Sequence, residues 1–235
     1  MSGARIRRGL VALAGGGVLF VALMGFAHTR AGRPLLAAMG RVMHGGACPL
    51  GYDRAASPAQ REAARTRFAA THRGEAPAAS RPALGFALDE TLRADVAAFM
   101  AARGITCRAS TGLADLVCNE VPAEALPAQQ ERAVPRNLWF TFGQQQRLLS
   151  VVALSRAASA EPISAGFERV ARGVAHDAGQ LAAITGDATA SALSSGVLRQ
   201  ATAELRFSDY YASARATNMG DGFLLTEEYR SLSRP

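Results

Sequence analysis

The pattern of apolar and polar positions begins with one continuous apolar segment. Residues 9–27 contain no charged side chain and consist mostly of alanine, valine, leucine, phenylalanine and glycine. As a helix this segment would rise about 28 Å, close to the thickness of the hydrocarbon core of a bilayer. Arg5, Arg7 and Arg8 precede it, and the positive-inside tendency keeps such an end in the cytoplasm. The pattern predicts a cytoplasmic N-terminus over residues 1–8 and a transmembrane signal anchor over residues 9–27.

A cleaved signal peptide is the alternative interpretation of this segment. Gly25 and Ala27 place small residues at the positions that signal peptidase reads. The apolar stretch is longer than a usual signal-peptide core, which favours a retained anchor. We therefore expect a single-pass protein of a bacterial inner membrane with its domain on the extracytoplasmic side. Cleavage near Ala27 would instead give a secreted protein.

Helical periodicity follows the apolar segment. Residues 34–44 place their large apolar side chains on one stripe, which predicts a short helix. Residues 57–71 begin with a serine cap, a proline and a glutamine in capping-box spacing, which predicts a second helix. Residues 73–88 contain two prolines and two glycines and are expected to be a linker. Together they predict a helical arm and linker over residues 28–88.

Residues 89–235 show the mixed pattern of a globular domain. Helices are expected over residues 89–104 and 161–186, and residues 187–196 are expected to form a polar loop. Strand patterns occupy residues 105–109, 115–121, 137–142, 147–154, 201–207, 210–217 and 223–229. The strands come in antiparallel blocks rather than in alternation with helices, which favours an α+β fold. We predict a small domain of antiparallel strands packed with two or three helices.

The kind and distribution of the basic residues exclude several functions. All 26 basic residues are arginine, so a P-loop lysine and a lysine Schiff base are excluded. The net charge is +7, but the part of the chain after residue 27 holds 23 of the arginines against all 19 acidic residues. These arginines are scattered without aromatic interleaving, so we expect no nucleic-acid binding.

The three cysteines make one disulfide prediction. Cys107 and Cys118 lie in two expected strands, and the midpoint between them falls between Gly112 and Leu113, so a hairpin would bring them face to face. Export to an oxidising compartment would favour a bridge between them. A bridge from Cys48 to either partner is the alternative that the sequence leaves open.

The histidines give no catalytic signature. His176 is followed by Asp177, but adjacent residues on a helix point about 100° apart, so we expect an exposed histidine without an orienting carboxylate. The nucleophile-elbow, His-Glu-x-x-His and Gly-x-Gly-x-x-Gly motifs are absent from the sequence.

The sequence gives equally weak evidence for a metal site and for an acidic catalytic cluster. His44, Cys48, Cys107 and Cys118 are suitable ligand types but lack clustered spacing. Asp209, Glu227 and Glu228 are expected to be surface charges, and residues 218–222 a hairpin turn. We therefore predict no catalytic, cofactor or metal site.

The sequence favours a non-enzymatic role in the cell envelope. We expect a membrane-anchored protein that binds or scaffolds another envelope protein. The candidate surfaces are the strand face that carries Trp139 and Thr141, the loop over residues 122–136, and a sheet edge. The alternative is an extracytoplasmic enzyme, such as a hydrolase, that uses His176 or the acidic strand residues.

Overall fold

A computed structural model of the protein describes residues 57–110, 114–122, 125–126, 136–143 and 145–233. The chain divides into two compact units, Met1–Arg54 and Ala55–Pro235. The first unit lies outside the described residues, and with it the predicted cytoplasmic N-terminus, apolar segment, first arm helix and Cys48. In the described part of the chain, no helix combines the length and apolar character that crossing a membrane requires.

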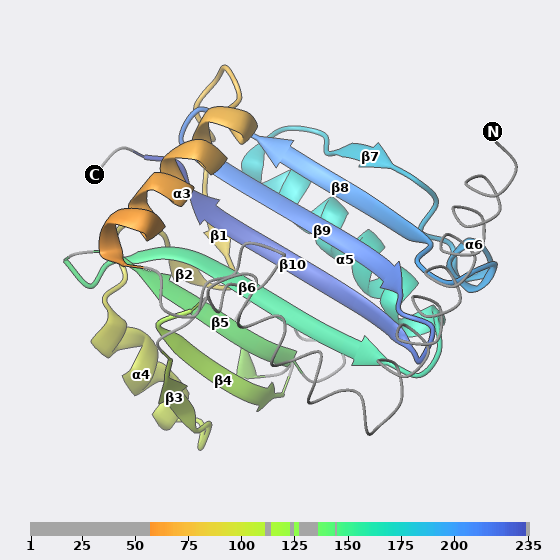
Figure 1. The fold of residues 1–235 in the computed structure, drawn as a ribbon, viewed down its shortest axis with the longest axis horizontal. Helices are drawn as coiled ribbons and strands as arrows, with labels where there is room; N and C mark the ends of the chain where they lie inside the picture. Colours follow the sequence, from red (N-terminus) through yellow and green to blue (C-terminus); the bar gives the residue numbers. More distant parts are fainter. Residues whose placement is uncertain (1–56, 111–113, 123–124, 127–135, 144, 234–235) are drawn as a thin grey trace, which may run out of the picture. The chain divides into compact units, whose positions relative to one another are not determined.

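The described residues build one large antiparallel sheet in the order β3-β4-β5-β6-β10-β9-β8-β7 (Figure 1). Its strands are β3 (Cys107–Ala109), β4 (Leu116–Val121), β5 (Arg136–Phe142), β6 (Leu148–Ala157), β7 (Ala183–Thr185), β8 (Gln200–Arg206), β9 (Tyr210–Asn218) and β10 (Phe223–Ser231). Seven of these eight strands lie where the sequence predicted them, and β7 was missed. The predicted α+β class is confirmed, and three of the four described helices lie within residues 89–235, in agreement with the two or three expected there.

Helix α5 (Glu161–Ala178) packs across one side of this sheet, here called the α5 face. Its buried side chains recur every three or four residues and include Ile163, Phe167, Val170 and Val174, as the amphipathic pattern predicted. Strands β8 and β9 present mainly alanines on this face, which lets the helix lie close to the sheet.

Helix α4 (Arg93–Ala101) and a small hairpin cover the rest of the α5 face. The hairpin joins β1 (Pro82–Ala83) to β2 (Phe86–Ala87) through two residues that both have positive φ, as in a type I′ turn. The ring of Phe86 meets Phe99 of α4 at 5.2 Å and Phe140 of β5 at 5.5 Å, both edge to face. These contacts close the hydrophobic core over β4, β5 and β6.

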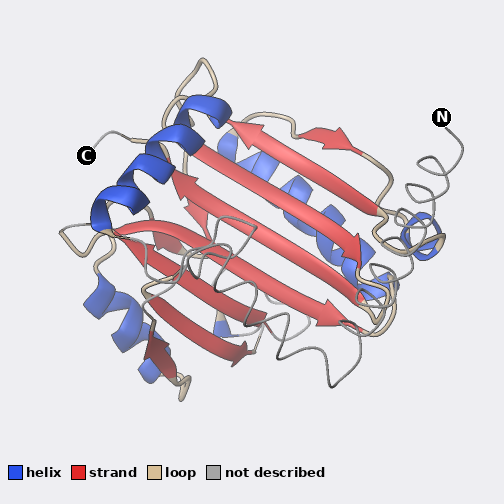
Figure 2. Ribbon diagram, in the orientation of Figure 1, coloured by secondary structure: helices blue, strands red, loops and turns tan. Residues whose placement is uncertain are grey.

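Helix α3 (Pro58–His72) lies on the opposite side of the sheet, here called the α3 face (Figure 2). The predicted capping box is present at its first turn. Its Phe68 ring contacts Tyr211 of β9 at 5.1 Å and lies 4.4 Å from the guanidinium carbon of Arg230 on β10. Among the described elements, α3 is the one that packs on this face, and it covers one end only (Figure 1).

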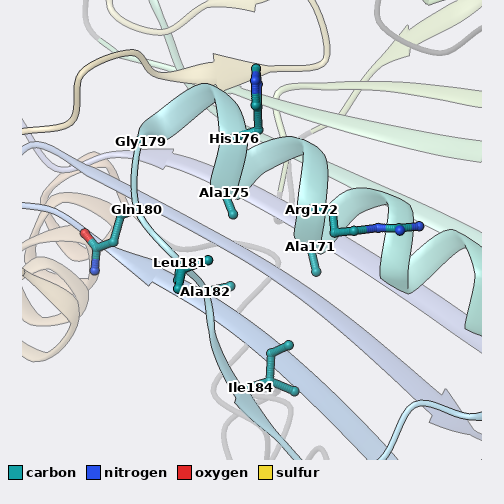
Figure 3. Close-up of a pocket in the computed structure, with 9 residues that line it drawn as sticks. All are labelled: Ala171, Arg172, Ala175, His176, Gly179, Gln180, Leu181, Ala182 and Ile184. Atoms are coloured by element: carbon teal, nitrogen blue, oxygen red, sulfur yellow. The ribbon is translucent and has the colours of Figure 1, made fainter.

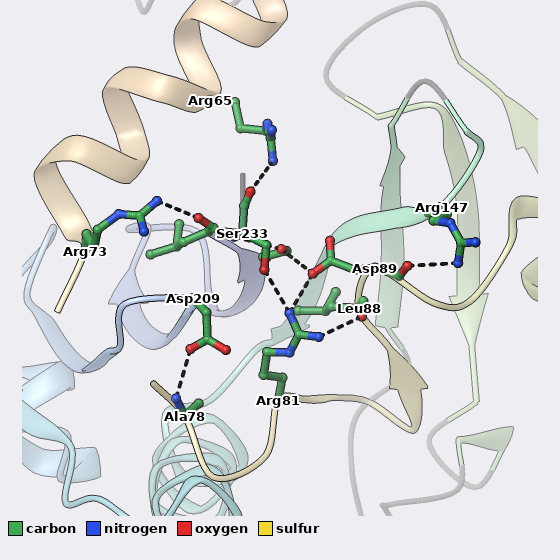
Figure 4. Close-up of polar contacts among 11 residues, drawn as sticks. Arg65, Arg73, Ala78, Arg81, Leu88, Asp89, Arg147, Asp209 and Ser233 are labelled. Atoms are coloured by element: carbon green, nitrogen blue, oxygen red, sulfur yellow. Dashed lines mark hydrogen bonds and ion pairs between the residues drawn. The ribbon is translucent and has the colours of Figure 1, made fainter. Parts of the chain in front are cut away.

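Residues 73–88 are part of the domain rather than a linker, so the packed unit begins well before Asp89. Pro82 and Gly85 belong to the short β1–β2 hairpin, and Leu84 and Leu88 lie in the core. Arg81 forms an ion pair with Asp89 at 2.6 Å, and the hydroxyl of Ser231 donates to the same carboxylate oxygen at 2.6 Å (Figure 4).

The residues that follow strand β10 are hydrogen-bonded in the same region to helix α3 and to its C-terminal cap. The guanidinium of Arg65 donates to the carbonyl oxygen of Ser233, and that of Arg73 donates to the carbonyl oxygen of Leu232 (Figure 4). The first described helix and the last described strand therefore belong to one packed body.

Two helix boundaries differ from the sequence prediction. Asp89 is not a helix cap, because its backbone has a φ of 66° and α4 begins only at Arg93. Helix α5 ends at Gly179, which adopts the left-handed conformation of a C-terminal cap, and not at Gly186. The residues that follow form β7, and the expected polar loop contains helix α6 (Ala190–Ser194).

Candidate partner-binding edge

The predicted disulfide is confirmed and lies at one edge of the sheet. Cys107 of β3 and Cys118 of β4 are paired in register, with a Cα–Cα distance of 4.2 Å, and form a disulfide. Cys48 is therefore not the partner of either residue. The bridge fixes the three-residue edge strand β3 to its one neighbour, and the exposed Arg108 places a charge on that strand.

The other edge of the described sheet is different in character. Strand β7 carries no charged residue, and all three of its residues are exposed. It pairs with β8 on one side, so its other side presents backbone N–H and C=O groups outward. Proteins commonly protect such an edge with a charge or a bulge, and β7 has no charge to do so.

An apolar groove of about 460 Å³ runs between α5 and this edge (Figure 3). Ala171 and Ala175 point into it from α5, and Leu181 and Ile184 line it from the β7 side. Ile184 pairs with Ala203, which faces α5, so the Ile184 side chain is also on the α5 face. Leu181 and Ile184 are nevertheless 89% and 62% exposed. Exposed side chains of this size beside a groove are typical of an interaction site.

Gly186 fixes the position of the edge strand. Its φ is +82°, and a Cβ atom there would lie 2.5 Å from the carbonyl oxygen of Gln200 at the start of β8. A side chain is therefore excluded both by the backbone conformation and by the close approach of β8. The chain leaving β7 is held against β8, which gives the edge a defined geometry.

His176 lines one end of the groove but points away from it (Figure 3). Its Nδ1 atom lies 3.1 Å from Oδ1 of Asp177, so the expectation that these neighbours do not meet was wrong. Both side chains are exposed, so the prediction that His176 is an exposed histidine is confirmed.

Trp139 and Thr141 lie on β5, on the α3 face and away from the groove. Both are half-buried, and Trp139 is flanked in register by Val117 of β4 and Val152 of β6. The structure therefore keeps the two residues on one face of one strand but does not bring them to the β7 edge. The predicted binding surface at these two residues stays a prediction, and most of the loop over residues 122–136 lies outside the described residues.

The acidic strand residues separate instead of forming a cluster. Asp209 accepts a hydrogen bond from the backbone N–H of Ala78 at 2.9 Å. Glu228 forms an ion pair with Arg230 on the α3 face. Residues 218–222 form the predicted hairpin turn, closed by the N–H of Met219 donating to the carbonyl oxygen of Gly222 at 2.8 Å.

Glu227 is not a surface charge. It is fully buried under α5, and its Oε1 atom lies 3.0 Å from Nη1 of Arg136, which is buried as well. The hydroxyl of Tyr229 donates to Oε2 at 2.8 Å. The Arg136–Glu227 contact is an ion pair without a well-aligned hydrogen bond, and Nε of Arg136 has no hydrogen-bond partner within the described residues.

Burial dominates the electrostatics of this buried pair. Removal from water raises the pKa of Glu227, whereas the charge of Arg136 and then the hydrogen bond from Tyr229 act to lower it. Burial likewise raises the pKa of Tyr229, and the neighbouring Glu227 adds to the rise. Both side chains of the pair are buried, so it offers no surface to a ligand.

Comparison of the chain with protein-family models, with curated proteins and with solved structures finds no match. Among the described residues, no group of three His, Cys, Asp or Glu side chains could hold a metal ion. The β7 edge and its groove therefore stand as the candidate site on their geometry. Sequence reasoning missed both because it extended helix α5 to Gly186, although Gly179 is an equally good helix-ending signal.

Proposed function

We propose that this protein is a non-enzymatic binding protein of the cell envelope that takes up an extended segment of a partner polypeptide at strand β7. The observation that supports the proposal most strongly is the uncharged edge strand beside an apolar groove. An extended segment can pair with the free backbone groups of β7 and so continue the sheet, which is the β-augmentation mode of recognition.

The groove adds selectivity to this backbone pairing. Side chains alternate between the faces of a sheet, so the partner residue opposite Ile184 would point to the α5 face, as Ile184 does. There it would cover Ala171 and Ala175 and remove Leu181 from water. The proposed partner segment therefore carries an apolar residue at this position and polar residues at its two neighbours.

The apolar segment 9–27 supplies the proposed location. Its length and the arginines before it support an anchor that leaves the domain on the extracytoplasmic side. The disulfide between Cys107 and Cys118 is consistent with an oxidising compartment. The partner is then another protein of the envelope.

Reporter fusions after Pro235 test this topology. A reporter that is active only outside the cytoplasm should be active in this fusion, because the anchor would carry the domain across the membrane. A fusion that activates a reporter working only in the cytoplasm would contradict the proposed location, and would do so whether or not the β7 edge binds a partner.

Binding at the β7 edge can be tested with peptides selected from a phage-displayed random library on the purified full-length chain. Replacing Ile184 with arginine should weaken binding of a selected peptide by about tenfold or more, about 1.4 kcal/mol, because a charge would enter the apolar contact. Isothermal titration calorimetry measures the loss. Binding of the peptide to the unchanged chain should also slow amide exchange at Ala183–Thr185.

Val197→Arg is the matched control, because it makes the same kind of change at an exposed aliphatic residue outside the groove. It should leave peptide binding unchanged. Peptides that bind the Ile184→Arg chain equally well would show that the site lies elsewhere. Self-association that is lost in Ile184→Arg would show that a second copy of the chain, and not another protein, occupies the edge.

A further inference from the structure

A second exposed apolar feature lies at the corner of the sheet where β8 begins. The N–H of Arg199 donates to the carbonyl oxygen of Gly196 at 3.4 Å, which closes a tight turn with Val197 and Leu198 at its centre. Their side chains are 67% and 70% exposed. Leu198 has a φ of +61°, a conformation that this position of a type II turn normally assigns to glycine or asparagine.

The left-handed backbone conformation of Leu198 is unfavourable for a leucine. Glycine would relieve the backbone, whereas leucine costs on the order of 1 kcal/mol and leaves a large apolar side chain in water. The turn is surface-exposed, so core packing does not explain the choice. Strain of this kind is often retained where an exposed side chain has a function.

A neighbouring turn completes the feature. Met219, in the β9–β10 turn, is 42% exposed, and the turns are joined because the N–H of Leu198 donates to the carbonyl oxygen of Asn218 at 2.8 Å. The Asn218 side chain is buried and donates to the carbonyl oxygen of Leu193 at 3.0 Å. Val197, Leu198 and Met219 thus form one exposed apolar cluster, here called the apolar tip. The two turns that carry it are fixed by these hydrogen bonds.

Cationic side chains stand beside the apolar tip. The Arg199 side chain lies along Gly196, with Cγ 3.8 Å from the position of a Cβ atom there, and is exposed. Arg156 is also exposed and forms an ion pair with Asp221 of the β9–β10 turn at 3.2 Å. Apolar side chains that lie beside an exposed arginine match the boundary between lipid headgroups and acyl chains.

We infer that the apolar tip inserts into the surface of a lipid bilayer. The inference rests on the proposed membrane anchor, which would keep the domain within reach of such a surface. The tip side chains project from two turns and present no free strand edge, so an extended protein segment is a poorer match for them than lipid is. Insertion would remove Val197, Leu198 and Met219 from water, while Arg199 would meet lipid phosphates.

Tryptophan fluorescence of the full-length chain tests the inference. The single native tryptophan is removed by Trp139→Phe, and Met219→Trp places a probe in the tip. The chain is reconstituted into vesicles of phosphatidylcholine and phosphatidylglycerol, with or without bromine on the upper acyl chain. Interfacial side chains enter about 5–10 Å into this boundary, so emission should shift to the blue and be roughly twofold lower with brominated lipid.

Two further variants make the test specific. Adding Leu198→Gly should abolish most of the quenching while the thermal midpoint stays the same or rises, because glycine suits the left-handed backbone. A probe introduced by Gln145→Trp, in the exposed β5–β6 turn at the opposite end of the sheet, should not be quenched.

Flotation of the vesicles separates this inference from the proposed anchor. A chain that floats with vesicles but shows no bromine quenching at position 219 would overturn tip insertion and leave the anchor standing. A chain that neither floats nor is quenched would overturn both. Blue-shifted emission without bromine quenching would indicate that a protein covers the tip, which also overturns insertion into lipid.

Discussion

Replacing Arg136 with methionine should lower the free energy of unfolding by about 3–5 kcal/mol at neutral pH. The variant leaves the carboxylate of Glu227 fully buried without its counter-charge. Removing one partner of a buried ion pair is costly because the remaining charge has lost both water and its partner. Urea denaturation of the purified full-length chain in mild detergent, followed by circular dichroism, measures the loss.

The same variant should become relatively more stable as the pH falls. Burial already raises the pKa of Glu227, and Arg136 is the first of the groups that oppose this rise, so its removal raises the pKa further. The folded state then holds a proton that the unfolded state releases, which favours folding below the folded pKa and is lost as the pH rises through it. The stability difference between Arg136→Met and the unchanged chain should therefore shrink on acidification toward the ordinary glutamate pKa.

The double variant Arg136→Met/Glu227→Leu is the control for this interpretation. It replaces both charges by apolar groups of similar volume, and such replacements are often neutral or stabilising. We expect it to recover most of the stability that Arg136→Met loses, although the hydroxyl of Tyr229 also loses its acceptor. A double variant as unstable as Arg136→Met, with no pH dependence in either, would contradict the buried-charge argument.

Much of the fold could be predicted because its signals are local and strong. The serine cap, proline and glutamine that begin α3 satisfy their own backbone groups within one turn, so tertiary structure had little to change. The alternation in Arg136–Phe142 reports a half-buried strand directly. The register of Cys107 with Cys118 follows from the length of the connection between their strands.

The candidate site escaped prediction because its signals are weak. Strand β7 has three residues, all exposed, and therefore no alternation to detect. Two prolines and two glycines in residues 73–88 suggested a linker, and only the tertiary structure shows that Pro82 and Gly85 belong to a hairpin whose Leu84 is buried. Short elements derive their conformation from neighbours that are distant in sequence, which local patterns do not report.

The buried ion pair had a signal that could have been used. Glu227 lies between Leu225 and Tyr229 at every second position of a strand, so alternation places it on the same face as those two core residues. Arg136 precedes Leu138 and Phe140 in the same way on β5. A charged residue in phase with a core stripe indicates a buried, paired charge, and two such strands with opposite charges indicate the partners.

Replacing both Cys107 and Cys118 with alanine should lower the free energy of unfolding by about 3 kcal/mol. The bridge closes a short loop, since its ends are 11 residues apart, and removing it returns conformational freedom to the unfolded chain. Alanine is preferred to serine because Cys118 is fully buried beside Leu138, where an unpaired hydroxyl would add its own cost. Urea denaturation without a reducing agent measures the difference.

The loss should be concentrated at one edge of the sheet. Strand β3 has three residues and pairs with β4 alone in the described sheet, so without the bridge its amides should exchange much faster, while those of β9 stay protected. Reducing the unchanged chain with dithiothreitol should reproduce both effects, and Cys48→Ala should produce neither. A double alanine variant that unfolds at the same urea concentration as the unchanged chain would show that the bridge contributes nothing to stability, and peptide mapping that finds Cys48 in the linked pair would show that the strands carry a different bridge.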